Sequence, residues 1–370
     1  MKLIRFLEIK KEKTDISIKG NNYTCGFEYS KGNSFEPEGL KCLQKFIISI
    51  LILGFISGCN YKHEKSIKAL IQAVPINSGF KMDGYWVWGG SVIKVDSTYH
   101  MFASRWPKGK EFPVDYFKSS EIVRATSKSI VGPYKFQEVI IGERDSSFWD
   151  SNMAHNPTIY KIGKEYVLFY IGSDFTTMRP GSNNYLRRVG YATASKIEGP
   201  WIRAEKPIID QESNNPAVLI DGHKIKLLFR DQDLRVVLAE ADNFKGPYKI
   251  VNNNVWPESK IEDFYLFKMN NLYHIICEDN AGTVTGHFRW GAHLYSENGI
   301  NNWKRYKDTI AYDHDIKYTN DSILHCKRRE RPQLLIENDH IIGLMTAVYN
   351  GKESWCQPVE LFPPFDLNNK

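Results

Sequence analysis

The sequence predicts an all-β protein, a five-bladed β-propeller in which four-stranded blades surround a central channel. Three observations support this prediction: a hairpin-like segment recurs five times, a Gly-Pro-aromatic turn follows three of the copies, and aromatic residues make up 13% of the 370 residues. High aromatic content with few long helical patterns is typical of β proteins. Five copies, each with its own hairpin, indicate radial repetition rather than one continuous sheet.

The hairpin repeat is clearest in residues 155–172, where a strand, a tight reversal and a second strand rich in Tyr, Val, Leu and Phe follow one another. Residues 214–231 repeat this pattern closely, and degenerate copies are found at 89–105, 261–279 and 330–347. Successive copies lie 66, 59, 48 and 68 residues apart when they are aligned on Ser91, Pro157, Pro216, Phe264 and Pro332.

A second periodic signal, the Gly-Pro-aromatic turn, indicates the outer strands. It occurs at residues 132–134, 199–201 and 246–248, each time after a short strand pattern with small alternating residues. The fourth repeat carries a relaxed version between Ser296 and Trp303. Each unit therefore predicts a hairpin, a third strand, a turn and an outer fourth strand. We expect the region from Trp355 onward to close the ring by pairing with the first blade.

Residues 41–59 resemble the signal peptide of a bacterial lipoprotein. Lys41 and Lys45 precede an 11-residue apolar run, 46–56, which is short for a membrane span and suits the core of a signal peptide. The run ends in Ile-Ser-Gly-Cys59, a match to the lipobox, in which the cysteine is lipidated. The alternative is a short buried helix that ends near Gly58.

This signal divides the chain into a non-mature leader (1–58), a lipidated cysteine with its tether (59–79) and the propeller as the catalytic domain (80–370). We therefore expect an exported bacterial lipoprotein that is located at the outer membrane or faces the periplasm, and that contacts the membrane through its lipid anchor alone. Residues 1–40 are polar and aperiodic and lie upstream of the signal, which suggests a start codon assigned too early.

Charge and cysteine content exclude several classes of protein. The net charge of the whole chain is +6, but residues 59–370 contain 40 basic and 37 acidic residues, a net charge of +3. This balance indicates no basic face for binding nucleic acid. Only Cys277, Cys326 and Cys356 follow Cys59, and this odd number does not provide a disulfide framework. No spacing of Cys and His residues fits a structural zinc ion. Nothing in the sequence indicates an oligomeric state.

The turns that open the blades are the expected place for chemistry. In a propeller the first strand of every blade lines the channel, and the turns before these strands meet at one end of it. Four of the five turns are polar or charged, although the repeats around them are apolar and Asn and Asp are also ordinary turn residues. The turns are Trp88-Gly89-Gly90, His155-Asn156, Asn214-Asn215, Glu262-Asp263 and Glu330-Arg331.

Together with the Gly-Pro-aromatic turns and the motif Ser296-x-Asn-Gly-x-x-x-Trp303, these turns resemble the five-bladed propeller glycosidases of glycoside hydrolase family 43 and its relatives in families 32, 62 and 117. The resemblance covers residues 80–365. In family 43 an Asp before blade one is the general base, an Asp before blade three tunes the acid, and a Glu before blade four is the general acid. The resemblance therefore implies that Glu262 is the acid, whereas Gly90 and Asn215 replace the two Asp residues.

The resemblance implies a glycoside hydrolase that acts on a plant or algal polysaccharide or oligosaccharide by two-carboxylate acid/base catalysis. Long connections between blades, such as residues 175–187, would wall off one end of the channel and favour an exo-acting enzyme. The sequence predicts a carbohydrate substrate, no cofactor and no metal ligands. Relatives in family 43 often hold a metal ion or water in the channel, so a channel Ca²⁺ is the alternative.

Glycoside hydrolysis requires two carboxyl groups beside the scissile bond, one protonated and one ionised. Aromatic neighbours and the adjacent Asp263 would raise the pKa of Glu262, as an acid requires. Asp150, which follows Trp149 just before blade two, is the first candidate for base or nucleophile, and Asp83 before blade one is the second. For both, a solvated turn carboxylate is the alternative. Weaker candidates are Asp231, Glu278 and Glu330.

Residues around these turns also offer groups that bind sugars. Aromatic rings pack on sugar faces, His and Asn pair with hydroxyls, and arginines bind the carboxylate of an acidic sugar such as a uronate. The predicted substrate-binding residues are Trp88, Arg105, Trp106, Trp149, His155, Asn156, Asn215, Arg230, Asp263, Glu330 and Arg331. The alternatives are core packing for the aromatic residues, solvent-facing charge for the arginines, and a structural ion pair between Glu330 and Arg331.

Two other functions compete with hydrolysis. A glycan-binding lipoprotein without catalysis is supported by Gly90 and Asn215 in place of the family's Asp residues. A glycoside phosphorylase would need a cationic phosphate site beside the acid, for which Arg230 and Arg331 are candidates. A second carboxylate about 5 to 10 Å from Glu262 favours hydrolysis, whereas amides and aromatic residues alone favour binding.

Overall fold

The structure is a computed structural model, and it describes residues 66–109, 112–113, 115–181 and 184–368. All described residues belong to one compact unit, Glu64–Lys370. The predicted signal peptide and the lipidation site at Cys59 lie outside the described residues. Within the described part, no helix is long and apolar enough to cross a membrane.

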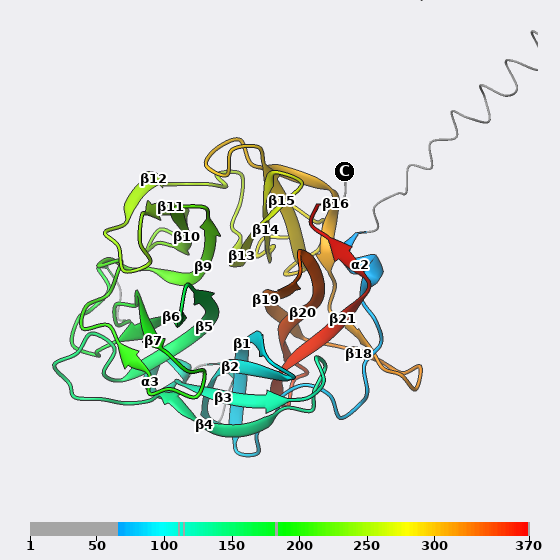
Figure 1. The fold of residues 1–370 in the computed structure, drawn as a ribbon, viewed down its shortest axis with the longest axis horizontal. Coiled ribbons are helices and arrows are strands. Elements are labelled where there is room, and N and C mark those ends of the chain that lie inside the picture. The colour runs from blue at the N-terminus through cyan, green and yellow to red at the C-terminus, as the bar shows by residue number, and fades with distance from the viewer. Residues whose placement is uncertain (1–65, 110–111, 114, 182–183, 369–370) are drawn as a thin grey trace, which may run out of the picture. The chain divides into compact units, whose positions relative to one another are not determined.

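Five sheets of this unit stand around a common centre, each forming one blade of a propeller (Figure 1). Blade I contains β1 (Tyr85–Val95), β2 (Thr98–Pro107), β3 (Glu121–Ser127) and β4 (Lys135–Ile141). Blade II contains β5 (Met153–Ile162), β6 (Glu165–Ser173), β7 (Arg188–Ala194) and β8 (Ile202–Arg203). Blade III contains β9 (Asn214–Asp221), β10 (Lys224–Arg230), β11 (Val236–Ala241) and β12 (Lys249–Asn252). Blade IV contains β13 (Glu262–Met269), β14 (Leu272–Glu278), β15 (Gly291–Ser296) and β16 (Lys304–Tyr312).

Blade V contains β19 (Arg328–Glu337), β20 (His340–Tyr349) and β21 (Ser354–Asp366). A small hairpin of β17 (Asp315–Lys317) and β18 (Ile323–His325) precedes it. Two short helices, α2 (Ile67–Leu70) and α3 (Tyr116–Ser119), complete the described elements. The prediction of an all-β, five-bladed propeller is confirmed, and all five hairpins fall where the repeat placed them.

The ring closes differently from the prediction. The region from Trp355 onward does not pair with blade I, because β21 pairs with β20 along its length as the third strand of blade V. The fourth position of this blade is taken by the segment before blade I, through bridges at Ile71 and Phe80. The Phe80 amide donates to the Cys356 carbonyl at 2.9 Å, and the Cys356 amide donates back at 3.1 Å. Closure thus joins the two ends of the described chain.

A β-bulge interrupts the first strand of every blade at the same place. At each bulge one residue has a left-handed backbone, with φ between 54° and 62°; these residues are Gly89, Asn156, Asn215, Asp263 and Arg331. Gly, Asn and Asp tolerate this region well, which explains four of the five choices. The repeat therefore aligns on Gly89 in blade I rather than on Gly90, one residue from the predicted position.

The Gly-Pro-aromatic turns connect the third and fourth strands of blades I, II and III, as predicted. In the first of them the Tyr134 ring is buried, and its hydroxyl donates to the Ile130 carbonyl at 3.0 Å. Apolar faces of neighbouring blades pack between the sheets, as Phe169 of blade II and Phe229 of blade III illustrate. This packing fixes the blades against one another and so positions the bulges around the channel.

Candidate active site

A pocket of about 260 Å³ is lined by residues of all five bulged strands. Other lining residues come from the connections around them, including the segment that carries Phe112 and Tyr116. Nine of the predicted site residues line this pocket: Trp88, Trp106, His155, Asn156, Asn215, Arg230, Glu262, Asp263 and Glu330. The bulge explains their convergence, because it turns the end of each first strand toward the same space.

Trp149 and Asp150 do not line the pocket but pack inside blade II. The Asp150 carboxylate is 1% exposed, forms ion pairs with Arg144 and Arg203, and accepts a hydrogen bond from Tyr170 at 2.6 Å. These contacts satisfy a buried carboxylate within the fold and leave it no path to a substrate in the pocket. Its position therefore gives no support to the prediction of Asp150 as base or nucleophile, nor to sugar binding by Trp149.

Asp83 and Arg105 also lie outside the pocket lining. Asp83 is exposed in the turn that precedes β1. The Arg105 guanidinium pairs with Glu121, with Nη2 and Oε1 2.7 Å apart. The pocket lining therefore gives no support to Asp83 as the second carboxylate. Arg105 is only 8% exposed, so it is not the solvent-facing charge of its alternative interpretation either.

Arg331 lies in the channel rather than on the pocket wall. Its side chain is 1% exposed and borders the bulge of blade I at Gly89. The nearest carboxylate is that of Asp263, with Oδ1 3.5 Å from Arg331 Nη1, and Asp263 also accepts from the Arg331 amide at 3.2 Å. The predicted ion pair of Arg331 with Glu330 does not form, since the partner is Asp263.

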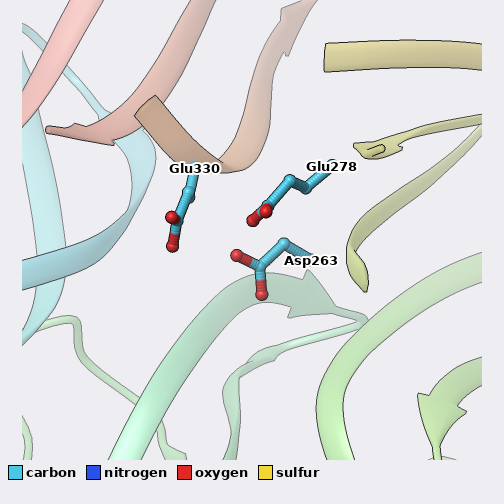
Figure 2. A group of neighbouring side chains, drawn as sticks. All are labelled: Asp263, Glu278 and Glu330. Atoms are coloured by element: carbon cyan, nitrogen blue, oxygen red, sulfur yellow. The ribbon is translucent and has the colours of Figure 1, made fainter. Parts of the chain in front are cut away.

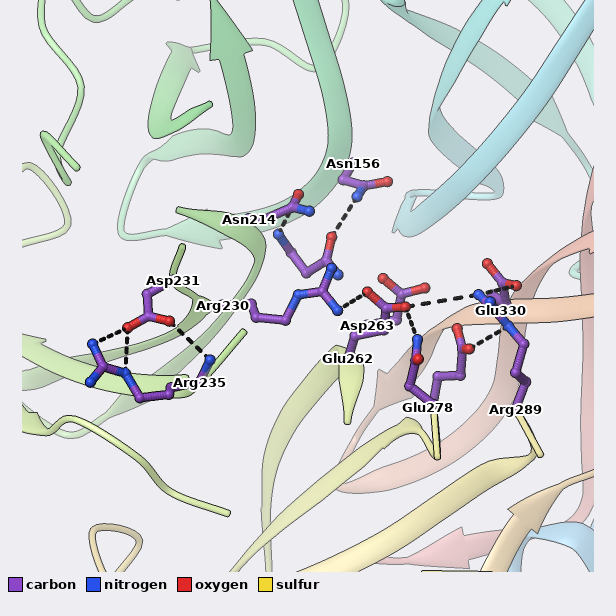
Figure 3. Close-up of polar contacts among 12 residues, drawn as sticks. Asn156, Asn214, Arg230, Asp231, Arg235, Glu262, Asp263, Glu278, Arg289 and Glu330 are labelled. Carbon is purple, nitrogen blue, oxygen red and sulfur yellow. Dashed lines mark hydrogen bonds and ion pairs between the residues drawn. The ribbon is translucent and has the colours of Figure 1, made fainter. Parts of the chain in front are cut away.

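Glu262, the predicted acid, begins β13 and faces two arginines (Figure 3). Arg230 at the end of β10 forms an ion pair with it, Asn280 donates a hydrogen bond to its Oε1, and Arg289 Nη2 lies 3.8 Å from the same oxygen. Burial raises the pKa of Glu262, and the charge of Asp263 adds to this, while Arg230 and Arg289 oppose it. The predicted direction of the shift is present, with burial as the main cause.

Three further carboxylates lie close together, as Figure 2 shows. Asp263, Glu278 and Glu330 are buried, and one oxygen of each lies within 4.8 Å of the others. Arg289 lies among them, with Nε 2.6 Å from Glu278 Oε1 and Nη2 2.7 Å from Glu330 Oε1. Burial and the neighbouring negative charges raise the pKa of Glu278 well above its ordinary value and that of Glu330 to about 7. Near neutral pH this group therefore holds protons.

This carboxylate group has the oxygen chemistry that suits a hard cation such as Ca²⁺. The protein's own cations already contact it, because Arg289 pairs with Glu278 and Glu330, and Arg331 Nη1 lies 3.5 Å from Asp263 Oδ1. Two guanidinium groups thus provide the positive charge that a metal ion would otherwise bring. The residues present do not fit a resident cation, and no step of the chemistry below is assigned to one.

Amide and imidazole groups form the opposite wall. Asn156 donates from Nδ2 to Asn215 Oδ1 at 2.8 Å, so the bulges of the neighbouring blades II and III are joined. The His155 ring stacks on Tyr116 with ring centres 4.5 Å apart, and its Nδ1 shares a hydrogen bond with Ser120 at 2.7 Å. Burial lowers the pKa of His155 well below its ordinary value, which keeps the ring neutral. Neutral donors and acceptors of this kind suit sugar hydroxyls.

Aromatic rings from blade I and the segment after β2 form the apolar part of the pocket. Phe112 stands 4.9 Å from Trp88 and 5.9 Å from Trp106, measured between ring centres. Trp106 also contacts the His155 ring edge-on at 5.4 Å. A flat apolar surface beside amides and charged groups is the composition that carbohydrate sites use.

Three pocket residues escaped the sequence analysis, Arg187, Arg289 and Arg328, as did Asn280, which donates a hydrogen bond to Glu262. Arg187 and Arg289 occupy equivalent positions, just before the third strands of blades II and IV. Their signal in the sequence is an arginine directly ahead of a third strand that has small residues. It was missed because only the turns ahead of first strands were considered.

Comparisons with known proteins identify the fold. No protein-family model and no curated protein matches the chain. Among solved structures, a family 117 glycoside hydrolase, Zg3597 from Zobellia galactanivorans, is 14% identical, with a TM-score of 0.59 over 81% of this chain and 91% of its own. A family 62 α-L-arabinofuranosidase from Coprinopsis cinerea is 13% identical, with a TM-score of 0.54 over 82% of this chain and 100% of its own. A thermostable family 43 glycoside hydrolase is 11% identical, with a TM-score of 0.54 over 75% and 90%.

These structures come from three of the families whose motifs the sequence resembles. At identities of 11 to 14% the comparison concerns the fold and not the activity. The described part of the chain has the five-bladed β-propeller fold of these glycoside hydrolases.

Proposed function

We propose that the protein is a glycoside hydrolase whose two catalytic carboxyl groups are those of Glu262 and Glu330. One observation carries this proposal: both side chains line the pocket and approach the same guanidinium nitrogen. Arg289 Nη2 lies 3.8 Å from Glu262 Oε1 and 2.7 Å from Glu330 Oε1, so the two oxygens are no further apart than these distances together. Carboxyl pairs in glycosidases work at separations of roughly 5 to 9.5 Å.

In this proposal Glu262 protonates the oxygen of the leaving sugar while the bond from that oxygen to the anomeric carbon breaks. Glu330 is the second carboxylate, in place of Asp150 and Asp83. In its ionised form, which prevails above its pKa of about 7, Glu330 takes a proton from the water that attacks the anomeric carbon, or attacks that carbon itself. The resemblance to family 43 supports the role of Glu262, and the position of Glu330 in the same pocket supports its role as partner.

The substrate proposed is the end of a plant or algal polysaccharide or oligosaccharide chain. A pocket of about 260 Å³ suits a terminal sugar better than the middle of a chain, and the buried Arg331 occupies the channel beside it. Arg187, which ends the long connection after β6, forms part of the pocket wall. These features support exo-action.

One observation favours the competing function, glycan binding without catalysis. Arg230 pairs with Glu262, and Asn280 donates a hydrogen bond to it, so two neighbours stabilise the ionised form of the residue that must be protonated. A site that only binds sugars can keep this arrangement, whereas a hydrolase must change it when substrate arrives.

The test is turnover of an oligosaccharide and aryl glycoside panel by the wild type, Glu262→Gln and Glu330→Gln. We expect Glu262→Gln to lose roughly 10²- to 10⁴-fold in rate on oligosaccharides but far less on dinitrophenyl glycosides, whose leaving group needs no proton. Glu330→Gln should lose both activities. Saturable binding without turnover in the wild type, unchanged in both variants, would leave a glycan-binding protein.

We also propose that Cys59 is lipidated and that the protein is exported and anchored by this lipid. Ile-Ser-Gly-Cys59 after an apolar run supports this. Expression with a radiolabelled fatty acid should label the wild type and leave Cys59→Ala unlabelled and free of the membrane fraction. Equal labelling of both chains would contradict the lipobox, and Cys326→Ala serves as the matched cysteine control.

A further inference from the structure

Four arginines line the pocket, one from each of blades II to V. They are Arg187, Arg230, Arg289 and Arg328. Three carboxylates line it with them, those of Glu262, Asp263 and Glu330. A pocket for an uncharged sugar needs hydroxyl partners and not this number of guanidinium groups. The question is which of these cations is free to meet a ligand.

Two of the four arginines are held by carboxylates that leave them little freedom. Arg187 donates from Nε to Glu212 Oε1 at 2.9 Å, and its own amide donates to Oε2 of the same residue at 2.9 Å. Arg289 joins Glu278 to Glu330. Both therefore act as parts of the scaffold.

Arg230 is different, because its partner is the proposed acid. Among the described residues, Glu262 is the one carboxylate that forms an ion pair with Arg230. The Arg230 side chain is 14% exposed and reaches the pocket from the end of β10 (Figure 3). Arg328 is the other available cation, since its nearest carboxylate oxygen, Glu330 Oε1, lies 3.8 Å away.

The chemistry of hydrolysis conflicts with this ion pair. When Glu262 carries the proton it must donate, Arg230 loses its counter-charge while remaining largely buried, and an unpaired buried guanidinium is strongly unfavourable. A neutral substrate leaves this conflict in place. A substrate that brings its own anion removes it, because that anion can pair with Arg230 while Glu262 takes up a proton.

We propose that the sugar bound in this pocket is anionic, and that its acidic group pairs with Arg230 and thereby releases Glu262 to act as the acid. This inference rests on the proposed function and names its substrate class, a sugar that carries a carboxylate or a sulfate. A uronic acid fits best, since the planar guanidinium fork binds a carboxylate through two parallel hydrogen bonds.

The surroundings of Glu262 agree with this exchange. The groups that face it are Arg230 from β10, Asn280 and Arg289 from the connection after β14, Asp263 beside it, and Arg187 at longer range. Loss of the Arg230 contact leaves burial and the charge of Asp263, both of which raise the pKa of Glu262, opposed by Arg289 and Arg187. Binding of an anion therefore favours the protonated acid.

The experiment is calorimetric titration of the full chain with matched sugar pairs: glucuronate and glucose, galacturonate and galactose, mannuronate and mannose. The 6-sulfates of the neutral sugars and inorganic phosphate complete the series. We expect at least one acidic sugar to bind about tenfold or more tightly than its neutral partner, as one charge-assisted pair provides. A sulfate that binds more tightly than every uronate would identify the anion as a sulfate ester.

Three variants locate the effect. Arg230→Gln should abolish the preference for the acidic sugar, and Arg230→Lys should keep part of it. Glu262→Gln should bind the acidic sugar more tightly than the wild type, because a neutral side chain no longer competes for Arg230. The matched control is Arg235→Gln, whose side chain pairs with Asp231 and does not line the pocket; it should behave as the wild type (Figure 3).

The outcomes separate this inference from the proposed function. Equal or tighter binding of the neutral sugars by the wild type overturns the inference, even where those sugars are hydrolysed. An acidic preference that depends on Arg230 without any turnover supports the inference and overturns hydrolysis. Turnover that requires inorganic phosphate, and phosphate binding that is lost in Arg230→Gln, would overturn it in favour of a phosphorylase.

Discussion

Burial sets the proton affinity of the Glu330 carboxyl, whose pKa is raised from its ordinary value of 4.5 to about 7. In the unfolded chain the group ionises at the lower value. The stabilising contribution of the protonated Glu330 to the free energy of unfolding is therefore fully present below pH 4.5. It is lost as the pH rises through 7. The loss amounts to about 3 kcal/mol in the free energy of unfolding.

Glu330→Gln should remove this pH dependence, because glutamine stays neutral throughout. Urea unfolding at pH 4.5 and pH 8 should show the wild type losing more stability than the variant over this interval, by an amount on the order of 3 kcal/mol. Parallel profiles for the two proteins would mean that Glu330 is ionised in the native state across the whole range. Glu337→Gln, at an acidic residue later in the same strand, is the control.

Asp150 provides a second test at the residue scale. The sequence pattern suggests a catalytic base or nucleophile, whereas the structure shows a buried carboxylate in ion pairs. Its carboxylate pairs with Arg144 and Arg203 and is fully enclosed. Asp150→Asn should lower the free energy of unfolding by about 3 to 5 kcal/mol, since it leaves two guanidinium groups without their counter-charge. Sugar binding by the folded fraction should not change. If Asp150→Asn instead lost turnover at unchanged stability, a catalytic role for Asp150 would be supported. Asp83→Asn, at an exposed turn, should alter neither quantity.

At the scale of elements, the bulge in each first strand is the device that builds the site. It places one left-handed residue per blade, and at Asn215 this residue has a φ of 54°. A β-carbon without a polar group is disfavoured there, whereas glycine is not. Asn215→Gly should therefore be more stable than Asn215→Ala by about 1 kcal/mol in denaturant unfolding.

A position with ordinary strand geometry gives the control for this comparison. At the exposed Lys249 in β12, glycine should be less stable than alanine by roughly 0.5 to 1 kcal/mol, the reverse order. The same order at both positions would mean that the Asn215 backbone is not held in the left-handed region. Both Asn215 variants lose the hydrogen bond from Asn156, so this loss cancels in the comparison.

The same elements show what the sequence can and cannot predict. Hairpins and Gly-Pro turns are local signals, so the blades and the position of Glu262 could be predicted. The blade I register was shifted by one residue because Gly89 and Gly90 carry no side chain to distinguish them. The burial of Asp150 could not be predicted, because it depends on Gly172, whose missing β-carbon leaves room for it. Such a contact joins residues that no local pattern connects.

The arginines of the pocket were missed for a related reason. Arg187 and Arg289 reach the site from connections between second and third strands, and only the three-dimensional ring brings them to the ends of the first strands. The ion pairs could not be predicted from the sequence either, because Arg289 pairs with Glu278 and Glu330, which lie in different blades. The polar turns predicted the location of the site, whereas its ion pairs depend on the three-dimensional arrangement of the blades.

At the scale of the whole molecule, the ring depends on one closure. The segment before blade I completes blade V through Phe80, whose ring is 1% exposed and packs with Val87 of blade I and Met345 and Cys356 of blade V. This contact and the hydrogen bond from the Val87 amide to Ser354 Oγ join blade I to blade V, whereas every other junction links blades that follow one another in the chain. The geometry around Arg289 is therefore coupled to a contact far from it in sequence.

Phe80→Ala should lower the free energy of unfolding by about 3 to 5 kcal/mol, because it leaves a cavity at the junction that closes the ring. Ile76→Ala, at a side chain that is 55% exposed in the same segment, should change it by no more than about 0.5 kcal/mol. Limited proteolysis distinguishes closure from general packing: the Phe80 variant should be cut first between residues 66 and 85 and in β21 while blades II and III stay protected. Uniform cleavage across all blades would show that the junction is no weaker than the rest, and that the propeller unfolds as one cooperative unit.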